Sequence, residues 1–259
     1  MKKTKVFVSD VENKKVAFLG SESGVSFGSL HQNMKTVLGD RKDLEDASLV
    51  VFTAGNLELE EKISWMKENL KEIQKGNFRG QIFIVATPVD FLTAQAEVCF
   101  PCEKGKVFGL GTAADTIYVK ERLAAYFQVN PEEINAYVLG LKGKDAFIPW
   151  DQVRISGVEL DTFAQMRGKF HYKEVLEEIE SVVREGNVGA DLITKTVGTI
   201  CKAIISNSKK VFTLSSLAKG EYGVENQAIS LPCLIGKDGI EFKVPLDLSP
   251  ADMKRLTNQ

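Results

Sequence analysis

A strand, helix and strand pattern between residues 48 and 86 decides the fold of this chain. It opens with SLVVFTAG (48–55), a β-branched apolar run, and it closes with QIFIVA (81–86), a second run of the same kind. Between them, apolar side chains recur at steps of three and four residues and predict an amphipathic helix over about 57–75: Ile63, Met66, Leu70 and Ile73. Strands that are apolar throughout are typical of a parallel sheet covered on both faces, so this stretch predicts a right-handed crossover unit.

The pattern continues outward from this unit in both directions. Further strand-like runs at 6–8, 16–19 and 106–110 extend the predicted doubly wound sheet of the first half. The second half has a different rhythm. Helices are predicted over 113–128, 172–185 and 190–206, and antiparallel strands over 135–139 and 148–160. The segments 211–217 and 228–248 carry strand and turn signals. Lys237-Asp238-Gly239 predicts a hairpin turn, and Ser249-Pro250 predicts the start of a last helix.

Composition excludes several broad functions. The formal net charge is -2, and no concentrated basic block supports binding to nucleic acid. No apolar stretch reaches the length of a membrane span, and the short apolar run near the start is broken by Asp10 and Glu12, so we expect no signal peptide and a cytoplasmic location. Cys99 and Cys102 have the spacing of a metal or redox pair, but the other two cysteines are isolated, which favours reduced, structural thiols.

Several motifs occur in an order and spacing that resembles the lactate/malate dehydrogenase family, and most closely its lactate branch. They are SLVVFTAG (48–55), ATPVD (86–90), GLGT (109–112) followed by Asp115, GLKG (140–143), TLSSLAKGEYG (213–223) and SLPC (230–233). The resemblance covers about residues 44–256. It implies an α/β fold, with a truncated, Rossmann-like doubly wound parallel sheet in residues 1–111 and the family's α+β C-terminal domain in residues 112–259.

The resemblance also implies which residues stand at the family's catalytic positions. In that family a histidine exchanges a proton with the substrate hydroxyl while nicotinamide exchanges a hydride. An aspartate orients the histidine, one arginine clamps the substrate carboxylate, and a second arginine on a mobile loop polarises the reacting carbonyl. Here the aspartate is Asp115, Lys142 replaces the histidine, Tyr118 replaces the clamping arginine, and Lys62 falls at the mobile arginine. By itself, Lys142 would be interpreted as a solvated loop charge, and Asp115 either as a helix-start acid or as a retained site residue.

Two threonines complete the substrate positions that the resemblance implies. Thr87 stands where the family usually has asparagine before a proline, and Thr199 falls near a substrate-pocket threonine.

These replacements predict a loss of the family's chemistry. Histidine titrates at roughly 6.5 and lysine at roughly 10.4, and a neighbouring carboxylate favours the charged lysine still further. A tyrosine hydroxyl offers one hydrogen bond where a guanidinium offers two parallel ones. Losing one transition-state contact typically costs on the order of 3 kcal/mol. We therefore expect a binding or assembly protein without NAD-dependent 2-hydroxy acid oxidoreductase activity. The alternative is an oxidoreductase that acts on a 2-hydroxy or 2-oxo acid with altered catalytic residues.

Two alignments of the first strands with the family's cofactor-binding strands remain open. The resemblance implies NAD, with Thr53, Ala54 and Gly55 at the cofactor edge. In one register the run 16–19 is the first strand, but the glycines that follow are spaced four and four and do not match G-x-G-x-x-G: Gly20, Gly24 and Gly28. In the other register, residues 5–10 are the family's second strand, Asp10 is the ribose-binding acid, and the phosphate loop is absent.

Expectations for partners also follow from the resemblance. It implies a homo-oligomer and a small 2-oxo acid as ligand, whereas the residues support neither nucleic acid nor membrane as a partner.

Overall fold

A computed structural model describes residues 4–11, 14–21, 36–39, 42–55, 57–76, 78–100 and 105–258. The first half contains β1 (Thr4–Val11), β2 (Lys14–Ser21), β3 (Thr36–Gly39), η1 (Lys42–Leu44), β4 (Leu49–Phe52), α2 (Leu59–Lys75), β5 (Gln81–Ile84), α3 (Val89–Cys99) and β6 (Val107–Gly109). The second half contains α4 (Ala113–Phe127), η2 (Pro131–Glu133), β7 (Ile134–Asn135), η3 (Trp150–Gln152), β8 (Arg154–Ile155), β9 (Val158–Glu159), α5 (Leu160–Met166), α6 (Tyr172–Glu185), α7 (Ala190–Ile205), β10 (Lys210–Lys219), η4 (Glu221–Gly223), β11 (Glu225–Gly236), β12 (Gly239–Lys243) and α8 (Pro250–Thr257).

One large sheet joins the two halves of the chain. Its described strands run in the order β12-β11-β10-β6-β5-β4-β2-β1-β3. The central strands β2, β4, β5 and β6 are parallel, which confirms the predicted crossover unit around α2. On one side β10, β11 and β12 continue the sheet in antiparallel order, and Ser215 pairs with Gly109 where β10 meets β6.

The direction of the first strand is a local departure from the predicted doubly wound parallel sheet. β1 pairs antiparallel with β2, and β3 pairs antiparallel with β1. Only residues 12 and 13 separate β1 from β2. A parallel crossover needs a dozen or more residues, so a connection of this length permits only an antiparallel hairpin.

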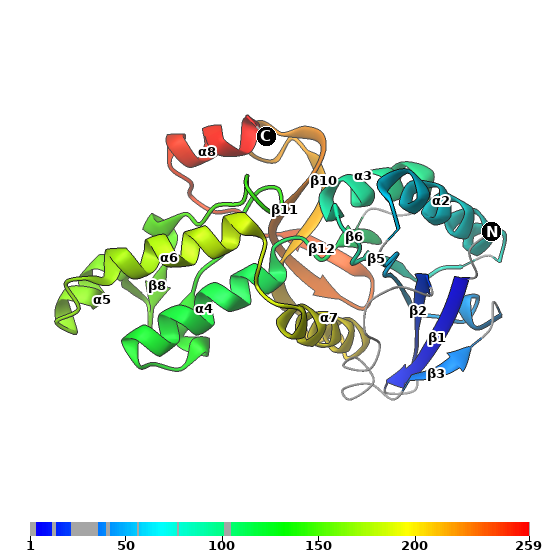
Figure 1. The fold of residues 1–259 in the computed structure, drawn as a ribbon, viewed down its shortest axis with the longest axis horizontal. Helices are drawn as coiled ribbons and strands as arrows, with labels where there is room; N and C mark the ends of the chain where they lie inside the picture. Colours follow the sequence, from blue (N-terminus) through cyan, green and yellow to red (C-terminus); the bar gives the residue numbers. More distant parts are fainter. Residues whose placement is uncertain are drawn as a thin grey trace.

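Helices cover both faces of the sheet. Figure 1 shows α2 and α3 over one face and α7 beneath the other. The strands between them are buried along their whole length in β4 and β5, as their apolar runs predict. The core that results includes Val197, Ile200 and Ile204 of α7 together with the strands, so α7 belongs to the core of the first half as well.

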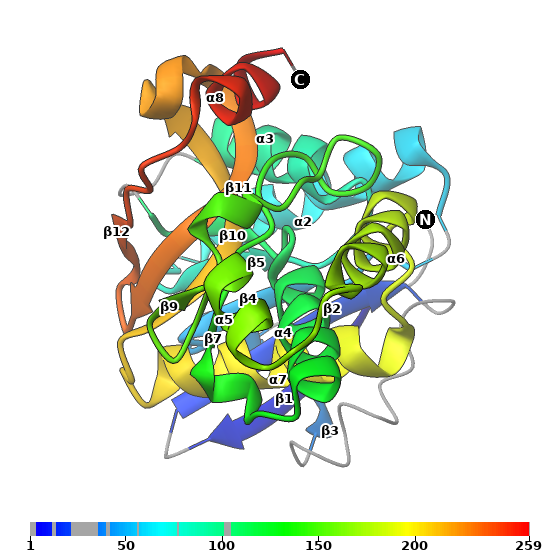
Figure 2. The same cartoon turned by 90° about the vertical axis from the view of Figure 1, so that its left-hand side faces the viewer.

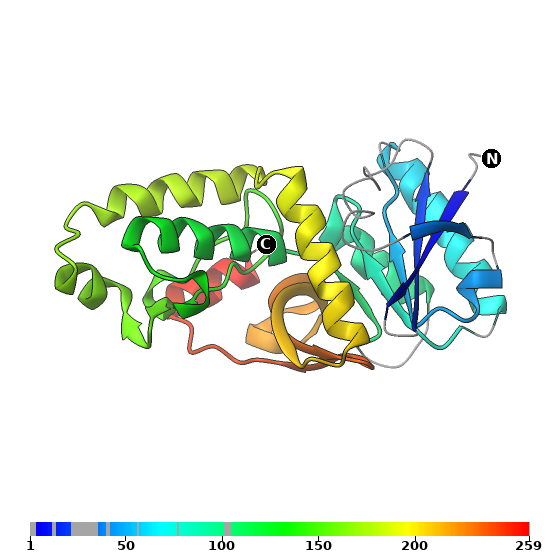
Figure 3. The same ribbon diagram turned by 90° about the horizontal axis from the view of Figure 1, so that it is seen from below.

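A second lobe extends away from the large sheet. It consists of α4, α5 and α6 with a small three-stranded sheet, and it lies at the far end of the molecule from the N-terminus (Figures 1 and 3). Its core forms between α4 and α6 through Val119, Leu123, Phe127, Ile179 and Val183. Figure 2 looks onto this lobe, with α4 and α6 side by side in front of the large sheet.

The predicted helices of the second half agree with the structure, but its first predicted strands are much shorter than expected. Over 135–139 and 148–160 the structure has only the two-residue strands β7, β8 and β9. Pro149 lacks an N–H for a ladder, and Ser156-Gly157 turn the chain with positive φ. The hairpin turn between β11 and β12 and the Ser249 cap of α8 are both confirmed.

Two further observations apply to the described residues alone. No helix in the described ranges is both long and apolar enough to cross a bilayer. Those ranges also contain no group of three or more histidine, cysteine, aspartate or glutamate side chains that could hold a metal ion. Cys99 is a free thiol, and Cys102 lies outside the described residues.

The packing of α2 against the sheet yields a stability prediction. Leu70 is 0% exposed, whereas Leu59 on the same helix is 43% exposed. We expect Leu70→Ala to lower the free energy of unfolding by about 2–5 kcal/mol, because it leaves a cavity in the core. Leu59→Ala should change it by about 0.5 kcal/mol or less. Urea unfolding followed by circular dichroism measures both, and equal effects would show that α2 does not pack as described.

Candidate functional site

The candidate site centres on an ion pair between Lys142 and Asp115. Asp115 lies in the first turn of α4, directly after β6, and its side chain is 1% exposed. The Lys142 ammonium Nζ lies 2.6 Å from Asp115 Oδ2, and the lysine side chain is 11% exposed. The interpretation of Lys142 as a solvated loop charge is therefore wrong. A long-range contact, over 27 residues of sequence, brings together the two residues predicted for the acid–base positions.

Hydrogen bonds from β11 and α3 position the loop that carries Lys142. Gly140 exchanges two backbone hydrogen bonds with Ser230, at 3.0 and 3.1 Å. The Lys142 backbone N–H donates to Asp90 Oδ2 at 2.8 Å, and the Ser230 hydroxyl donates to Asp90 Oδ1 at 3.4 Å. Asp90 thus fixes the backbone of Lys142, and this orients the lysine side chain toward Asp115.

Asp90 is a site residue that the sequence reasoning missed. It was visible only as the last residue of the ATPVD motif, an acid in the first turn of a helix that follows a buried strand. Burial raises the pKa of its carboxyl group above the ordinary value, while the hydrogen bonds from Lys142 and Ser230 act in the opposite direction.

Hydrogen bonds of threonine hydroxyls position the start of α4. Thr116 and Thr213 share a hydrogen bond of 2.7 Å between their hydroxyls, and the Val138 N–H donates to the Thr116 hydroxyl at 2.9 Å. The Thr112 hydroxyl donates to the Val138 carbonyl at 2.5 Å. These bonds tie α4 to β10 and to the segment before Lys142. Asp115 Oδ1, in contrast, has no hydrogen-bond partner among the described residues.

The other predicted catalytic residues do not join this pair. The Lys62 ammonium donates to the backbone carbonyl of Thr87 at 2.8 Å, so these two predicted positions meet each other at the carboxyl end of β5. Tyr118 is half-buried and packs against the core of the second lobe. Thr199 is exposed on α7, and its hydroxyl donates to the Lys195 carbonyl one turn earlier. Within the described ranges, no hydrogen bond or ion pair connects these groups to Asp115 or Lys142.

The predicted cofactor residues lie at opposite ends of the strands of the sheet. Thr53, Ala54 and Gly55 follow β4 at the carboxyl edge, and the Thr53 hydroxyl donates to Leu19 of β2 at 3.1 Å. Asp10 pairs with Lys15 at the start of β2, at the opposite edge, because β1 runs antiparallel. Asp10 therefore does not fit the predicted role of ribose-binding acid. Gly24 and Gly28 lie outside the described residues.

Breaking the ion pair should destabilise the fold. Lys142→Met leaves the Asp115 carboxylate buried without a counter-charge, and we expect a loss of about 3–5 kcal/mol in the free energy of unfolding. Adding Asp115→Asn removes that charge and should restore most of the loss. Lys144 is exposed in the same loop, so Lys144→Met is the matched control. Denaturant unfolding compares the variants, and a Lys142→Met protein as stable as Lys144→Met would contradict the buried pair.

The raised pKa of Asp90 predicts a pH dependence. In the unfolded chain this carboxyl group titrates at its ordinary value of 3.8, and in the folded protein it titrates higher. Its contribution to stability is therefore complete below 3.8 and is lost as the pH rises through the raised value. Relative to Asp90→Asn, which lacks this titration, the wild-type protein should lose unfolding free energy as the pH increases from that range toward neutrality. A difference that is constant or of opposite sign would overturn the assignment.

Comparisons with known proteins agree with this architecture. The alpha/beta C-terminal domain of lactate/malate dehydrogenase matches residues 112–259, more than half of the chain. L-lactate dehydrogenase from Priestia megaterium is 30% identical over 239 residues, which is 86% of this chain and 75% of the relative. L-lactate dehydrogenase 2 from Clostridium acetobutylicum is 29% identical over 245 residues, covering 86% and 76% of the two chains.

Solved structures show the same fold. The lactate dehydrogenase MGS-M5 from a Medee basin deep-sea metagenome library superimposes with a TM-score of 0.78 at 27% identity, covering 85% of this chain and 76% of that one. The ligand-free minor L-lactate dehydrogenase of Enterococcus mundtii, at 21% identity and a TM-score of 0.77, covers 85% and 76% and supports the fold alone. Matched motifs, domain and fold agree, and the chain belongs to the lactate/malate dehydrogenase family, on its L-lactate dehydrogenase branch.

Proposed function

We propose that this chain is a non-catalytic member of its family that acts as a binding or assembly protein, without turnover of 2-hydroxy acids. The observation that carries the proposal is the 2.6 Å contact between the Lys142 ammonium and the buried Asp115 carboxylate. In that contact the group at the histidine position holds a proton in an ion pair. It is poorly suited to accept a proton from a substrate hydroxyl, which a general base must do.

The surroundings of the pair support the same conclusion. Tyr118, three residues after Asp115, supplies a phenol that packs against the second lobe, so a substrate carboxylate has no two-pronged cation at that position. Lys62 is hydrogen-bonded to the Thr87 carbonyl rather than to either member of the pair. The described histidine, His171, is exposed at the start of α6 and lies 3.5 Å from Glu174, so it does not stand in for the missing imidazole.

One observation favours a second candidate, an oxidoreductase that acts on a 2-hydroxy or 2-oxo acid with altered residues. Lys142 is positioned on Asp115 by Asp90, and its ammonium uses one of its three N–H donors in the contact with Asp115. An ammonium in this position could donate a proton to the oxygen of a 2-oxo acid during reduction. This candidate also requires NAD. Its predicted positions Thr53, Ala54 and Gly55 lie together after β4, whereas Asp10 lies at the other end of the strands.

Assembly is the part of the proposal that draws on the relatives. Members of this family are generally oligomeric, and we propose a homo-oligomer in which the chain contributes structure rather than turnover. A cytoplasmic location belongs to the same proposal.

Oxidation of NADH by the purified protein separates the two candidates. With pyruvate or oxaloacetate as substrate, we expect no oxidation above the rate measured with Lys142→Met, because the pair does not serve as acid or base. A turnover in the ordinary range of about 1–1000 per second would refute the non-catalytic proposal. A lower rate that depends on Lys142 would support the second candidate.

A parallel titration of NADH, followed by its fluorescence, tests the cofactor edge independently of turnover. We expect weak or absent binding, because Asp10 lies at the opposite edge of the sheet from Thr53. Saturable binding that is abolished by Gly55→Val would instead show that the carboxyl edge still holds a nucleotide.

A further inference from the structure

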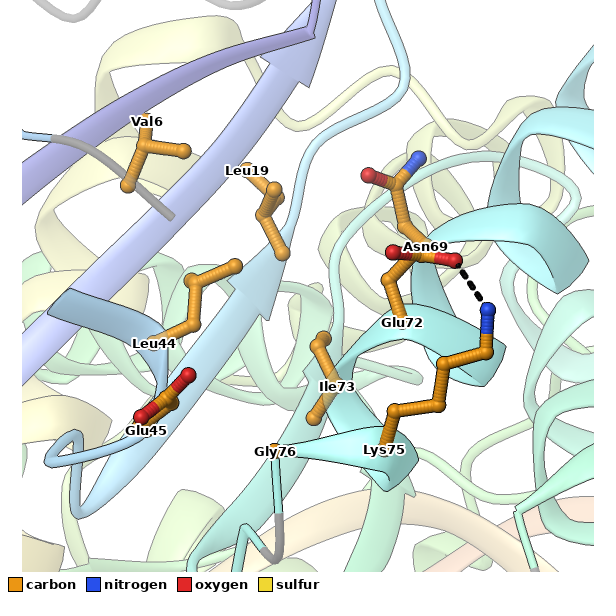
Figure 4. A pocket seen from close by; sticks show the side chains of 9 residues that line it. All are labelled: Val6, Leu19, Leu44, Glu45, Asn69, Glu72, Ile73, Lys75 and Gly76. Atoms are coloured by element: carbon orange, nitrogen blue, oxygen red, sulfur yellow. Dashed lines mark hydrogen bonds and ion pairs between the residues drawn. The ribbon is translucent and has the colours of Figure 1, made fainter. Parts of the chain in front are cut away.

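A pocket of about 330 Å³ lies between the sheet and α2, away from the Lys142–Asp115 pair. Figure 4 shows it enclosed by β1 and β2 on one side and by the second half of α2 on the other. Its walls are largely apolar and come from four buried side chains: Val6, Leu19, Leu44 and Ile73. Burying an apolar group of matching size against these walls is favourable, because it removes apolar surface from water.

The buried amide of Asn69 also lines this pocket. Asn69 is 7% exposed, and its Nδ2 donates to the Trp65 carbonyl at 2.7 Å. A carbonyl only accepts hydrogen bonds, so this bond fixes the amide orientation and turns Oδ1 the other way. In Figure 4 the Asn69 oxygen lies on the side that faces Leu19. No donor in the described part of the chain reaches Oδ1, so this acceptor is available to a ligand.

Among the described residues, acidic side chains outnumber basic ones at the mouth of the pocket. Glu72 and Lys75 form an ion pair of 2.8 Å on α2, and Glu45 lies across the mouth beside Gly76. The charged groups that line the pocket within the described ranges are therefore two carboxylates and one ammonium. A ligand that enters here meets an apolar wall, one unused acceptor and a field that favours cations.

We propose that this pocket binds a small primary amine that carries an apolar group. The apolar group packs against Leu19, Leu44 and Ile73, and the ammonium donates a hydrogen bond to Asn69 Oδ1. The carboxylates at the mouth favour the amine over an alcohol or an acid of the same shape. The site is independent of the candidate catalytic pair and of any nucleotide, so it can be tested whether or not the protein turns over a substrate.

Isothermal titration calorimetry with 2-phenylethylamine tests the proposal on the full chain, with 2-phenylethanol and 3-phenylpropionate as neutral and anionic probes. We expect the amine to bind at least about tenfold more tightly than the acid, with the alcohol in between. Asn69→Leu should weaken binding of the amine by about tenfold, because it removes the acceptor. Glu45→Gln should weaken it by roughly two- to fivefold, since this charge is exposed.

The matched control is Glu68→Gln, an exposed glutamate on α2 that does not line the pocket, and it should bind the amine like wild type. Urea unfolding checks that each variant is folded, and Glu45→Gln keeps the test open if Asn69→Leu is not. Equal binding of the amine and the acid would overturn the proposal. So would unchanged amine binding by Asn69→Leu in a folded protein, or no binding of the amine at millimolar concentration.

Discussion

The buried ion pair between Lys142 and Asp115 is the interaction on which the rest of the site depends. A carboxylate that is 1% exposed needs a counter-charge, and the Lys142 ammonium provides it at 2.6 Å. Asp90 and Ser230 place the lysine backbone, and the hydroxyls of Thr112 and Thr116 tie the start of α4 to Val138. We propose that this ion pair occupies the positions of the family's acid–base residues and that its role in this chain is structural.

This arrangement connects fold and function through the sheet. Thr53, Thr87 and the start of α4 follow the carboxyl ends of the parallel strands β4, β5 and β6 and so lie on the same side of the sheet. Ser230 of β11, from the other half of the chain, pairs with Gly140 in the Lys142 loop. The site thus forms only where both halves meet. Function resides in the side chains at that edge and not in the fold itself, so family membership and the proposed loss of turnover are compatible.

Much of the fold could be predicted from local patterns, because the signals act over short distances. The apolar runs of β4 and β5, the periodicity of α2 and α6, the Lys237-Asp238-Gly239 turn and the Ser249 cap all agree with the structure. The direction of β1 was missed because the predicted runs 6–8 and 16–19 are shorter than β1 and β2, which leave only residues 12 and 13 between them. The burial of Lys142 and the role of Asp90 depend on contacts over 27 and 52 residues, and no local pattern encodes such contacts.

The most direct test of this account is the protonation and protection of the Lys142 side chain at neutral pH. NMR of protein labelled with ¹⁵N at the lysine ammonium groups, with the Lys142 signal assigned by its loss in Lys142→Met, reports both. The account predicts a charged ammonium whose protons exchange slowly with water, and faster exchange in Asp115→Asn. A neutral amine, or an ammonium that exchanges as fast as the exposed Lys144, would contradict the central claim.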